Sequence, residues 1–330
     1  MSGNEKSDKI QNYFEDFVGF IIKITEIYHY EGKTDEALLI FKSNIQVMDF
    51  EEVGSEDKAK FLIQYAKILQ QSKFIKEFNY DNEIKILTEA QELAKSSNAK
   101  NLMAEALDLI GTCIYSSGIL EGDYQKAIDF FDQALKIRME INDIHGLCKS
   151  YFNLGLYHEN IKDSNEENKR KSFDFYQRGL KIAIEENLKL EQSYFYRHLA
   201  FFSQYYENDN EKSLQYHLNS ATLREEIGFK ISLQFSYFAV AMEYFFLKDF
   251  ENSLNYFEKA YSWAINIHKV EQLKVIIFRH GSQMIQANET ENAIKYYELV
   301  LESAKKVRDL EGAREIEVEI KNLSINFKKY

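Results

Sequence analysis

Apolar residues recur along this chain at intervals of three and four residues, the spacing that places side chains on one face of an α-helix. Residues 9–30 show it, with Ile10, Phe14, Phe17 and Ile21 at helical spacing. Polar connections interrupt the pattern, so we expect helices joined in pairs. The predicted pairs are 9–30 with 37–47, 57–77 with 84–95, 100–117 with 123–140, 147–160 with 168–184, 190–206 with 211–226, 230–247 with 250–266, and 271–287 with 290–306, followed by a closing helix at 311–327.

One helix-packing motif organises these pairs. Ala127, Phe131 and Ala134 lie four and three residues apart, so they share one face of a helix. The small residues let a neighbouring helix approach, and the ring fills the space between them. Leu154 and Gly155 supply the matching surface on the next helix. A residue larger than Ala at 134 is expected to clash, at a cost of roughly 1–3 kcal/mol.

The same small–large–small motif recurs through the chain. Its other copies are Ala37/Phe41/Asn44, Glu83/Leu87/Ala90, Ser172/Tyr176/Gly179, Ser213/His217/Ser220, Ser253/Phe257/Ala260 and Ala293/Tyr297/Val300. First members of successive copies are 40 to 46 residues apart. Repetition at such a period indicates stacked helical hairpins, each of which contacts its neighbours. The first two copies fit least well, because Asn44 and Glu83 stand where a small residue is expected.

The chain resembles the tetratricopeptide-repeat family over about residues 15–305, and the Leu154-Gly155-Leu156-Tyr157 stretch is similar to that family's first-helix signature. The resemblance implies an all-α, right-handed superhelical solenoid of about seven hairpins with a C-terminal capping helix. The period exceeds the usual 34 residues, and the chain has no proline. These departures are typical of the long-repeat branch, which is similar to kinesin light chains, spindle adaptors and bacterial peptide receptors.

The quality of the match to the repeat pattern varies along the chain, and it predicts three regions. Residues 1–77 form an N-terminal helical region with a degenerate repeat, 78–306 form the regular array, and 307–330 form a capping helix and tail. A hydrophobic content of 45% with 28% charged residues is enough for a continuous core.

Charge and cysteine content limit the possible partners and location. A net charge of −12 argues against nucleic-acid binding, and it suits a basic partner segment. Apolar runs stop well short of the 18 residues of a membrane span, so no membrane association is expected. Cys113 and Cys148 have no CxxC spacing, and we expect buried free thiols in a cytoplasmic protein.

Sequence motifs of known catalytic, metal-binding and phosphate-binding sites are missing from this chain. The seven histidines show no metal-ligand spacing, and phosphate-binding and nucleophile-elbow motifs do not occur. We therefore expect neither an enzyme nor a metal or other cofactor.

The resemblance also implies a binding surface, because the first helix of each hairpin lines the concave side of such an array. Aromatic side chains there supply contact area, and Asn, Lys or Arg supply polar contacts to a peptide. Asn153 looks like the position where long-repeat relatives place a peptide-binding asparagine. The predicted peptide-binding residues are Lys149, Phe152, Asn153, Tyr194, Arg197, Phe201, Phe238 and Phe278.

These observations favour a non-enzymatic scaffold or adaptor that binds a peptide segment of a partner protein. The alternative is a peptide-responsive regulator resembling bacterial quorum-sensing receptors or response-regulator phosphatases. An enzyme with an unrecognised site and a self-assembling protein that associates through its end repeats also stay open. The sequence does not determine the oligomeric state.

Overall fold

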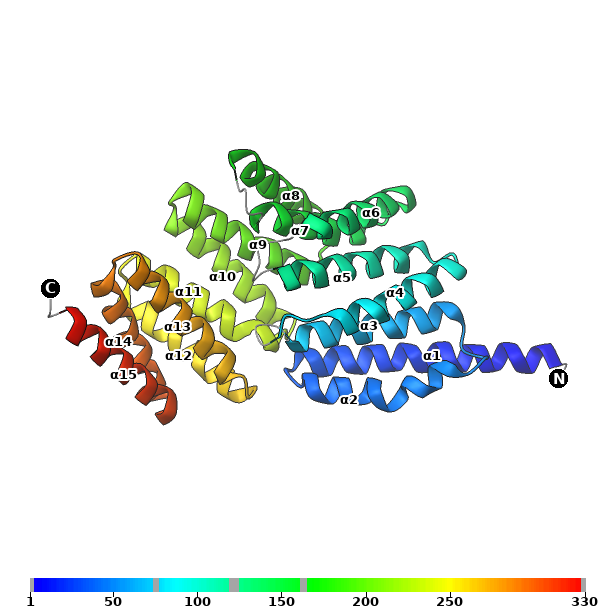
Figure 1. The fold of residues 1–330 in the computed structure, drawn as a ribbon, viewed down its shortest axis with the longest axis horizontal. Coiled ribbons are helices and arrows are strands. Elements are labelled where there is room, and N and C mark those ends of the chain that lie inside the picture. Colours follow the sequence, from blue (N-terminus) through cyan, green and yellow to red (C-terminus); the bar gives the residue numbers. More distant parts are fainter. Residues whose placement is uncertain (1–2, 74–76, 119–124, 161–164, 328–330) are drawn as a thin grey trace. The chain divides into compact units, whose positions relative to one another are not determined.

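The computed structural model describes residues 3–73, 77–118, 125–160 and 165–327 (Figure 1). All regular structure in these ranges is helical, and no strand occurs in them. The α-helices are α1 (Gly3–Tyr30), α2 (Thr34–Asn44), α3 (Ser55–Lys73), α4 (Asp81–Ser96), α5 (Lys100–Gly118), α6 (Gln125–Ile141), α7 (Ile144–Asn160), α8 (Glu166–Glu185), α9 (Lys189–Phe202), α10 (Asn210–Glu226), α11 (Leu233–Phe246), α12 (Phe250–Asn266), α13 (Val270–Gln286), α14 (Thr290–Lys306) and α15 (Leu310–Phe327).

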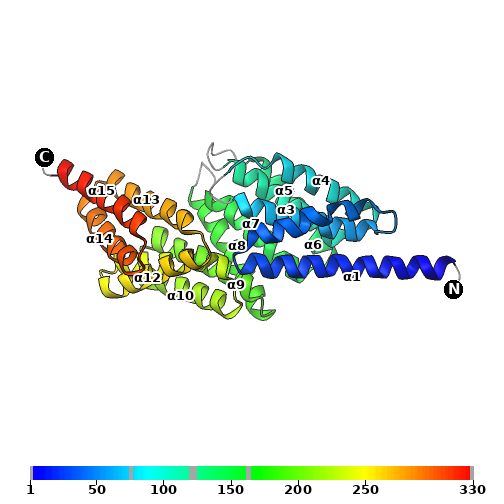
Figure 2. The same cartoon turned by 90° about the horizontal axis from the view of Figure 1, so that it is seen from below.

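The predicted all-α fold is confirmed, and six of the predicted hairpins are formed among the described residues. Contacts join α1 to α2, α3 to α4, α5 to α6, α7 to α8, α11 to α12 and α13 to α14, and α15 packs on α14 as the expected closing helix (Figure 1, Figure 2). The predicted helix at 190–206 differs in one respect: its α-helical part ends at Phe202, and Ser203–Glu207 form a π-helical turn. The connections expected near 119–124 and 161–164 lie outside the described residues.

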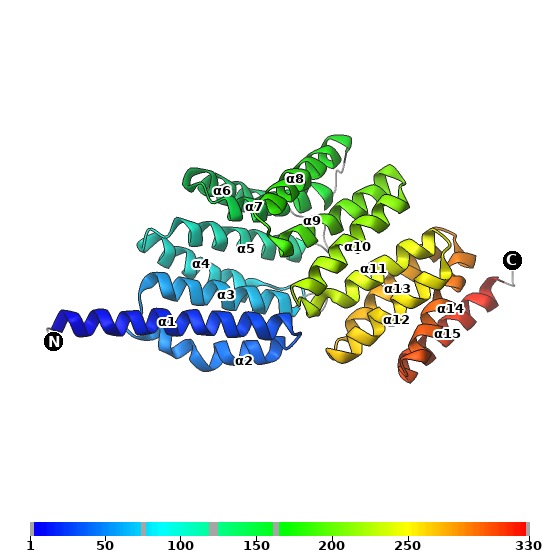
Figure 3. The ribbon, with the colours of Figure 1, turned by 180° about the vertical axis from the view of Figure 1, so that it is seen from behind.

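The chain divides into two compact parts, which we call unit 1 (residues 1–195) and unit 2 (residues 196–330). Within unit 1 the first helices of successive hairpins are neighbours, since α3 contacts α1 and α5, and α5 contacts α7 (Figure 1, Figure 3). The boundaries predicted after residues 77 and 306 concern the type of repeat rather than compactness, and they stay predictions.

The small–large–small motif packs as the sequence predicts. Ala127, Phe131 and Ala134 are at most 1% exposed. A Cβ atom added to Gly155 would lie 2.3 Å from the Tyr176 ring, and one added to Gly111 would lie 2.6 Å from the Phe131 ring. The ring of each second helix therefore rests directly on the glycine of a first helix.

The two copies that fit the motif least well differ in how their unusual residue is accommodated. Asn44 is partly exposed, and its side-chain amide donates to the Ile40 carbonyl. Glu83 is fully buried, and its carboxylate pairs with Lys73 at 2.7 Å. A buried carboxylate is tolerated at this position because a cation from α3 neutralises it.

Helix ends repeat with the same period as the motif. The second helices are followed by a residue with φ between 53° and 69°, namely Asn98, Asn142, Asn187, Gly228, His268 and Arg308. The next amide then bonds back across the last turn, as from Asp143 N to Arg138 O at 3.0 Å. This is the Schellman type of helix end, in which a left-handed residue terminates the helix. Such ends explain how a chain without proline stops its helices at regular intervals.

The two cysteines are buried free thiols, as predicted. Burial raises the pKa of each to about 12, which keeps them protonated at neutral pH. In the described part of the chain no helix is both long and apolar enough to cross a membrane. The same residues contain no group of three or more His, Cys, Asp and Glu side chains arranged to hold a metal ion.

Candidate peptide-binding face

An ion pair between two first helices lies on unit 1. Lys149 Nζ on α7 is 3.0 Å from Glu105 Oε1 on α5, and the two side chains are 37% and 28% exposed. Burial acts to raise the pKa of Glu105, but Lys149 and Lys67 outweigh it and lower this pKa to about 2. The pKa of Lys149 is raised by Glu105 against the opposing effect of burial. Both side chains are therefore partly exposed, and neighbouring charges as well as burial determine their ionisation.

A second cation, Lys67 on α3, faces the same carboxylate. Its ammonium group has no hydrogen bond or ion pair with any residue that the structure describes. Burial and the nearby Lys149 lower its pKa, whereas Glu105, Glu26 and Glu191 act to raise it. Lys67 therefore offers donors that the protein itself does not use.

Side chains from α1 and α9 also lie near this group of charges. Burial raises the pKa of Tyr30 on α1, and Glu26, Tyr194 and Glu191 add to the increase. Glu191 and Tyr194 belong to α9, so residues of α1 and α9 interact although α3, α5 and α7 come between them in the sequence. The start of α9 and the end of α1 therefore both lie near the charged residues of α3, α5 and α7.

Two of the predicted aromatic residues, on α7 and α9, contact each other. The ring of Phe152 on α7 lies 5.5 Å from the ring of Tyr194 on α9, between centroids. Phe152 also contacts Tyr176 and Phe195 at 6.1 and 5.9 Å. Both Phe152 and Tyr194 stay partly exposed. We call Lys67, Glu105, Lys149, Phe152 and Tyr194 together the unit 1 face.

Asn153 is turned inward rather than toward this face. It is 9% exposed and lies near the buried Asp108, whose pKa is raised by burial, while Arg138 and Asn153 act to lower it. Arg138 on α6 bonds Asp108, and it donates to Ser150 Oγ on α7 at 2.8 Å. Arg138, Asp108 and Ser150 thus form a buried network that joins three helices. Asn153 lies buried beside it, and direct peptide contact by Asn153 finds no support.

The sequence contains a signal for this network that the repeat pattern alone did not reveal. Arg138 follows Ala134 by four residues on the packing face, where an apolar residue is expected. In unit 2 Arg224 occupies the equivalent position, and it donates to Ser236 Oγ at 2.8 Å. Both arginines precede their serine by 12 residues, and this repeated spacing marks them as structural.

The predicted residues of unit 2 are more closely packed. The Arg197 guanidinium lies 5.5 Å from the centroid of the Phe201 ring, and Phe201 meets His217 edge-on at 5.1 Å. Phe278 is partly buried and lies 6.0 Å from Tyr297. Arg197, Phe201 and Phe278 keep some exposed surface, and their role in binding stays a prediction.

Phe238 is different, because it is only 3% exposed. Its ring packs against Phe257 at 5.7 Å and His280 at 5.2 Å. Phe238 is therefore a core residue of unit 2, and its predicted contact with a peptide finds no support in the structure.

A buried His–Glu pair also lies in unit 2. His217 Nε2 on α10 is 3.8 Å from Glu243 Oε1 on α11, and both side chains are 2% exposed. Burial and the nearby Arg197 and Arg224 lower the pKa of His217 to about 3. Burial raises the pKa of Glu243 to about 7. The imidazole is therefore neutral at pH 7, and Glu243 titrates near neutrality.

Comparison with known proteins identifies one repeat directly. The family model for the tetratricopeptide repeat matches residues 236–264, which cover most of α11 and α12. No curated protein matches the sequence.

Solved structures with a similar fold are more distant in sequence. The apo form of RapI has a TM-score of 0.58 and 13% identity over 88% of this chain and 99% of its own. A Rap protein complexed with Competence and Sporulation Factor has a TM-score of 0.52 and 11% identity, over 96% and 99% of the two chains. A signal transduction ATPase with a tetratricopeptide repeat sensor, from Pyrococcus horikoshii, has a TM-score of 0.54 and 17% identity over 96% of this chain.

The present chain spans only 47% of the Pyrococcus protein. At these identities the similarity shows the fold alone. The resemblance to the tetratricopeptide-repeat family is nevertheless confirmed, because the chain contains one recognisable tetratricopeptide repeat and has the helical-hairpin fold of these proteins.

Proposed function

We propose that this chain is a non-enzymatic, cytoplasmic interaction scaffold that holds a peptide segment of a partner protein against the unit 1 face. The observation that carries the proposal is the ammonium group of Lys67, which has no hydrogen bond or ion pair among the described residues and lies near Glu105 and Lys149, on the unit 1 face that includes the partly exposed rings of Phe152 and Tyr194. A peptide carboxylate would pair with Lys67, and an apolar side chain would pack on Phe152 and Tyr194. The fold supports this use, since repeats of this type present their first helices to ligands.

Panning of a phage-displayed peptide library on the full-length protein tests the proposal. Selected peptides are then synthesised and their affinities measured by fluorescence anisotropy. We expect a Lys67→Ala/Tyr194→Ala variant to bind at least 10-fold more weakly, because it loses a charge-assisted contact and an aromatic anchor. The matched control is Lys181→Ala, which removes a cation from a 77% exposed side chain on the second helix α8.

Unchanged affinity in the double variant would exclude the unit 1 face as the binding site. Circular dichroism spectra and thermal transitions of all three proteins check that any loss of affinity is not a loss of fold. An effect of Lys181→Ala as large as that of the double variant would show that overall charge, and not the unit 1 face, controls binding.

A peptide-responsive regulator is the second candidate. It is favoured by the fold similarity to a Rap protein whose structure contains Competence and Sporulation Factor, since that similarity extends over 96% of this chain. Small-angle scattering distinguishes the two functions with a selected peptide. A change in the radius of gyration on binding supports a receptor that responds to its ligand, and an unchanged radius supports a scaffold.

A further inference from the structure

One long side of α1 carries an unbroken row of apolar side chains, which we call the α1 stripe. The row is Ile10, Tyr13, Phe17, Phe20, Ile24 and Ile27. Apart from Phe17, which is partly buried, these residues are exposed, with Tyr13 at 70%, Phe20 at 65% and Ile27 at 63%. Contiguous exposed apolar side chains are unusual on a protein surface and indicate an interaction site.

Among the described elements α1 packs against α2 and α3, and neither of them covers the α1 stripe. α3 packs between α1 and α5, and α5 packs between α3 and α7, whereas α1 is the first helix of the described chain. In Figure 2 α1 runs along one edge of unit 1. Among the described residues α3 and α5 contribute no exposed large apolar side chain. The exposed apolar side chains of α1 therefore set it apart from the first helices α3 and α5, and a contiguous apolar surface of this kind is typical of an interface.

The spacing in the stripe fits a partner helix. Its members are separated by three, four, three, four and three residues, which is the spacing of a coiled-coil seam. In an antiparallel pair of identical helices, Phe17 faces Phe20 of the second copy, and Tyr13 faces Ile24 in the same way. Every residue of the stripe then meets another member of the stripe, so the surface is complementary to itself.

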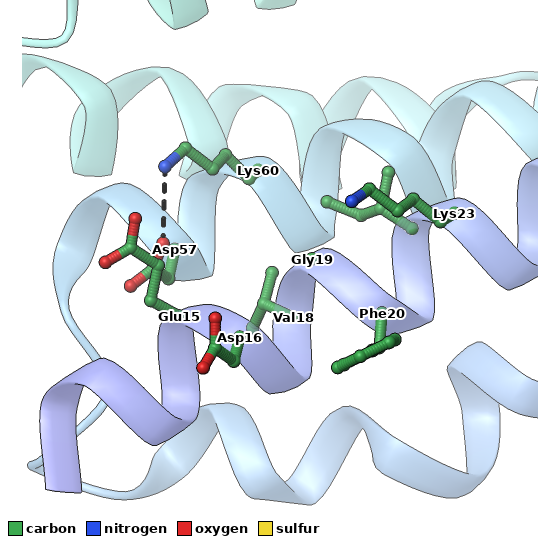
Figure 4. Close-up of a pocket in the computed structure, with 9 residues that line it drawn as sticks. Glu15, Asp16, Val18, Gly19, Phe20, Lys23, Asp57 and Lys60 are labelled. Atoms are coloured by element: carbon green, nitrogen blue, oxygen red, sulfur yellow. Dashed lines mark hydrogen bonds and ion pairs between the residues drawn. The ribbon is translucent and has the colours of Figure 1, made fainter.

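The charges beside the stripe agree with this register. Asp16 and Lys23 flank the seam at equivalent positions one heptad apart. In an antiparallel pair, Asp16 of each copy therefore lies beside Lys23 of the other copy. Both residues line a surface depression of about 310 Å³, together with Gly19 and Phe20. Figure 4 shows Asp16, Phe20 and Lys23 projecting from α1 at this depression.

We propose that the α1 stripe is a symmetric interface at which two copies of this chain associate through antiparallel α1 helices. Each copy contributes roughly 500 Å² of exposed apolar surface, so the pair buries about 1,000 Å², near the lower limit of specific interfaces. The dimer is therefore expected to dissociate on dilution. A lipid surface fits less well, because membrane-surface helices are rich in Lys and Arg on the polar face, and this chain has a net charge of −12.

Sedimentation velocity of the full-length protein over a concentration series tests the proposal. We expect a reversible monomer–dimer equilibrium in the wild type. Phe20→Glu acts twice in a symmetric interface and should weaken association roughly 100-fold. Val318→Glu, at a 59% exposed position on α15, is the matched control and should leave the equilibrium unchanged. A wild type that stays monomeric throughout, or a Phe20→Glu variant that still dimerises, overturns the proposal.

Charge exchange tests the antiparallel register. Asp16→Lys alone and Lys23→Asp alone each place like charges together and should weaken association about 10-fold. A mixture of these two variants should recover association, because each heterodimer contains two opposite-charge pairs. No contact within a single chain is restored by mixing. Failure of the mixture to associate better than either variant alone rejects the antiparallel arrangement.

Discussion

The contact between Gly155 and Tyr176 predicts that the same substitution has opposite effects at two positions of the chain. An added Cβ at Gly155 would lie 2.3, 2.6 and 2.9 Å from three atoms of the Tyr176 ring. An added Cβ at Gly19 on α1 would have no heavy atom within 4 Å. Both residues are inside helices, where Ala is favoured over Gly by about 1 kcal/mol.

The ring has no room to yield at Gly155. Tyr176 is 1% exposed, and its hydroxyl donates to Glu159 Oε2 at 2.7 Å, so both ends of the side chain are held. Overpacking in a fixed core costs roughly 1–3 kcal/mol, and a contact this short belongs in the upper part of that range. After the gain in helix propensity, Gly155→Ala is expected to lower the free energy of unfolding by about 1–2 kcal/mol. Gly19→Ala is expected to raise it by about 0.5–1 kcal/mol.

Urea denaturation followed by circular dichroism measures both variants against the wild type. Low protein concentration keeps self-association from contributing to the apparent stability. If Gly155→Ala proves as stable as Gly19→Ala, then the close approach of α7 and α8 does not constrain residue 155, and the packing argument for the repeat motif fails.

Three further outcomes are expected. Asp108→Ala alone should destabilise the protein by up to roughly 3–5 kcal/mol in urea unfolding, because the buried Arg138 loses its closest carboxylate and keeps only Asp143, whose Oδ2 is 3.7 Å from Arg138 Nε, and adding Arg138→Met should recover part of the loss. Ala134→Leu should cost roughly 1–3 kcal/mol by overpacking, seen as a lower thermal midpoint. The raised pKa of Glu243, about 7, means that its contribution to stability is present below pH 4.5 and is lost as pH rises through 7. Glu243→Gln should remove that loss, roughly 3 kcal/mol between pH 5 and 8. His217, whose pKa is lowered to about 3, acts in the opposite sense, so the comparison with this variant isolates Glu243.

The hairpins were predictable because their signals are local. The small–large–small motif and the three- and four-residue spacing depend on residues within two turns of one helix, and they placed α5 to α8 and α10 to α15 within a few residues. The absence of proline did not affect the prediction of helix ends, because residues in the left-handed conformation, such as Asn142, end the helices instead.

Which side chains reach the surface was harder to predict, because that depends on helices distant in the sequence. Asn153 and Phe238 lie on first helices, as expected, but neighbouring hairpins cover them. Lys67 gave no sequence signal, because it lies in the region where the repeat fits least well. Its importance follows only from the proximity of Lys149 and Glu105, residues of two other hairpins.

The buried network and the unit 1 face are connected through the helices that carry them. Asp108 and Glu105 lie one turn apart on α5, and Ser150 directly follows Lys149 on α7. Arg138 bonds both Asp108 and Ser150, so it fixes the position of α5 relative to α7 beneath the Glu105–Lys149 pair. Loss of Arg138 would therefore disturb the face as well as the core. A binding defect in a variant of Asn153, which is buried beside this network, would consequently report on the position of the face rather than on a contact with the peptide.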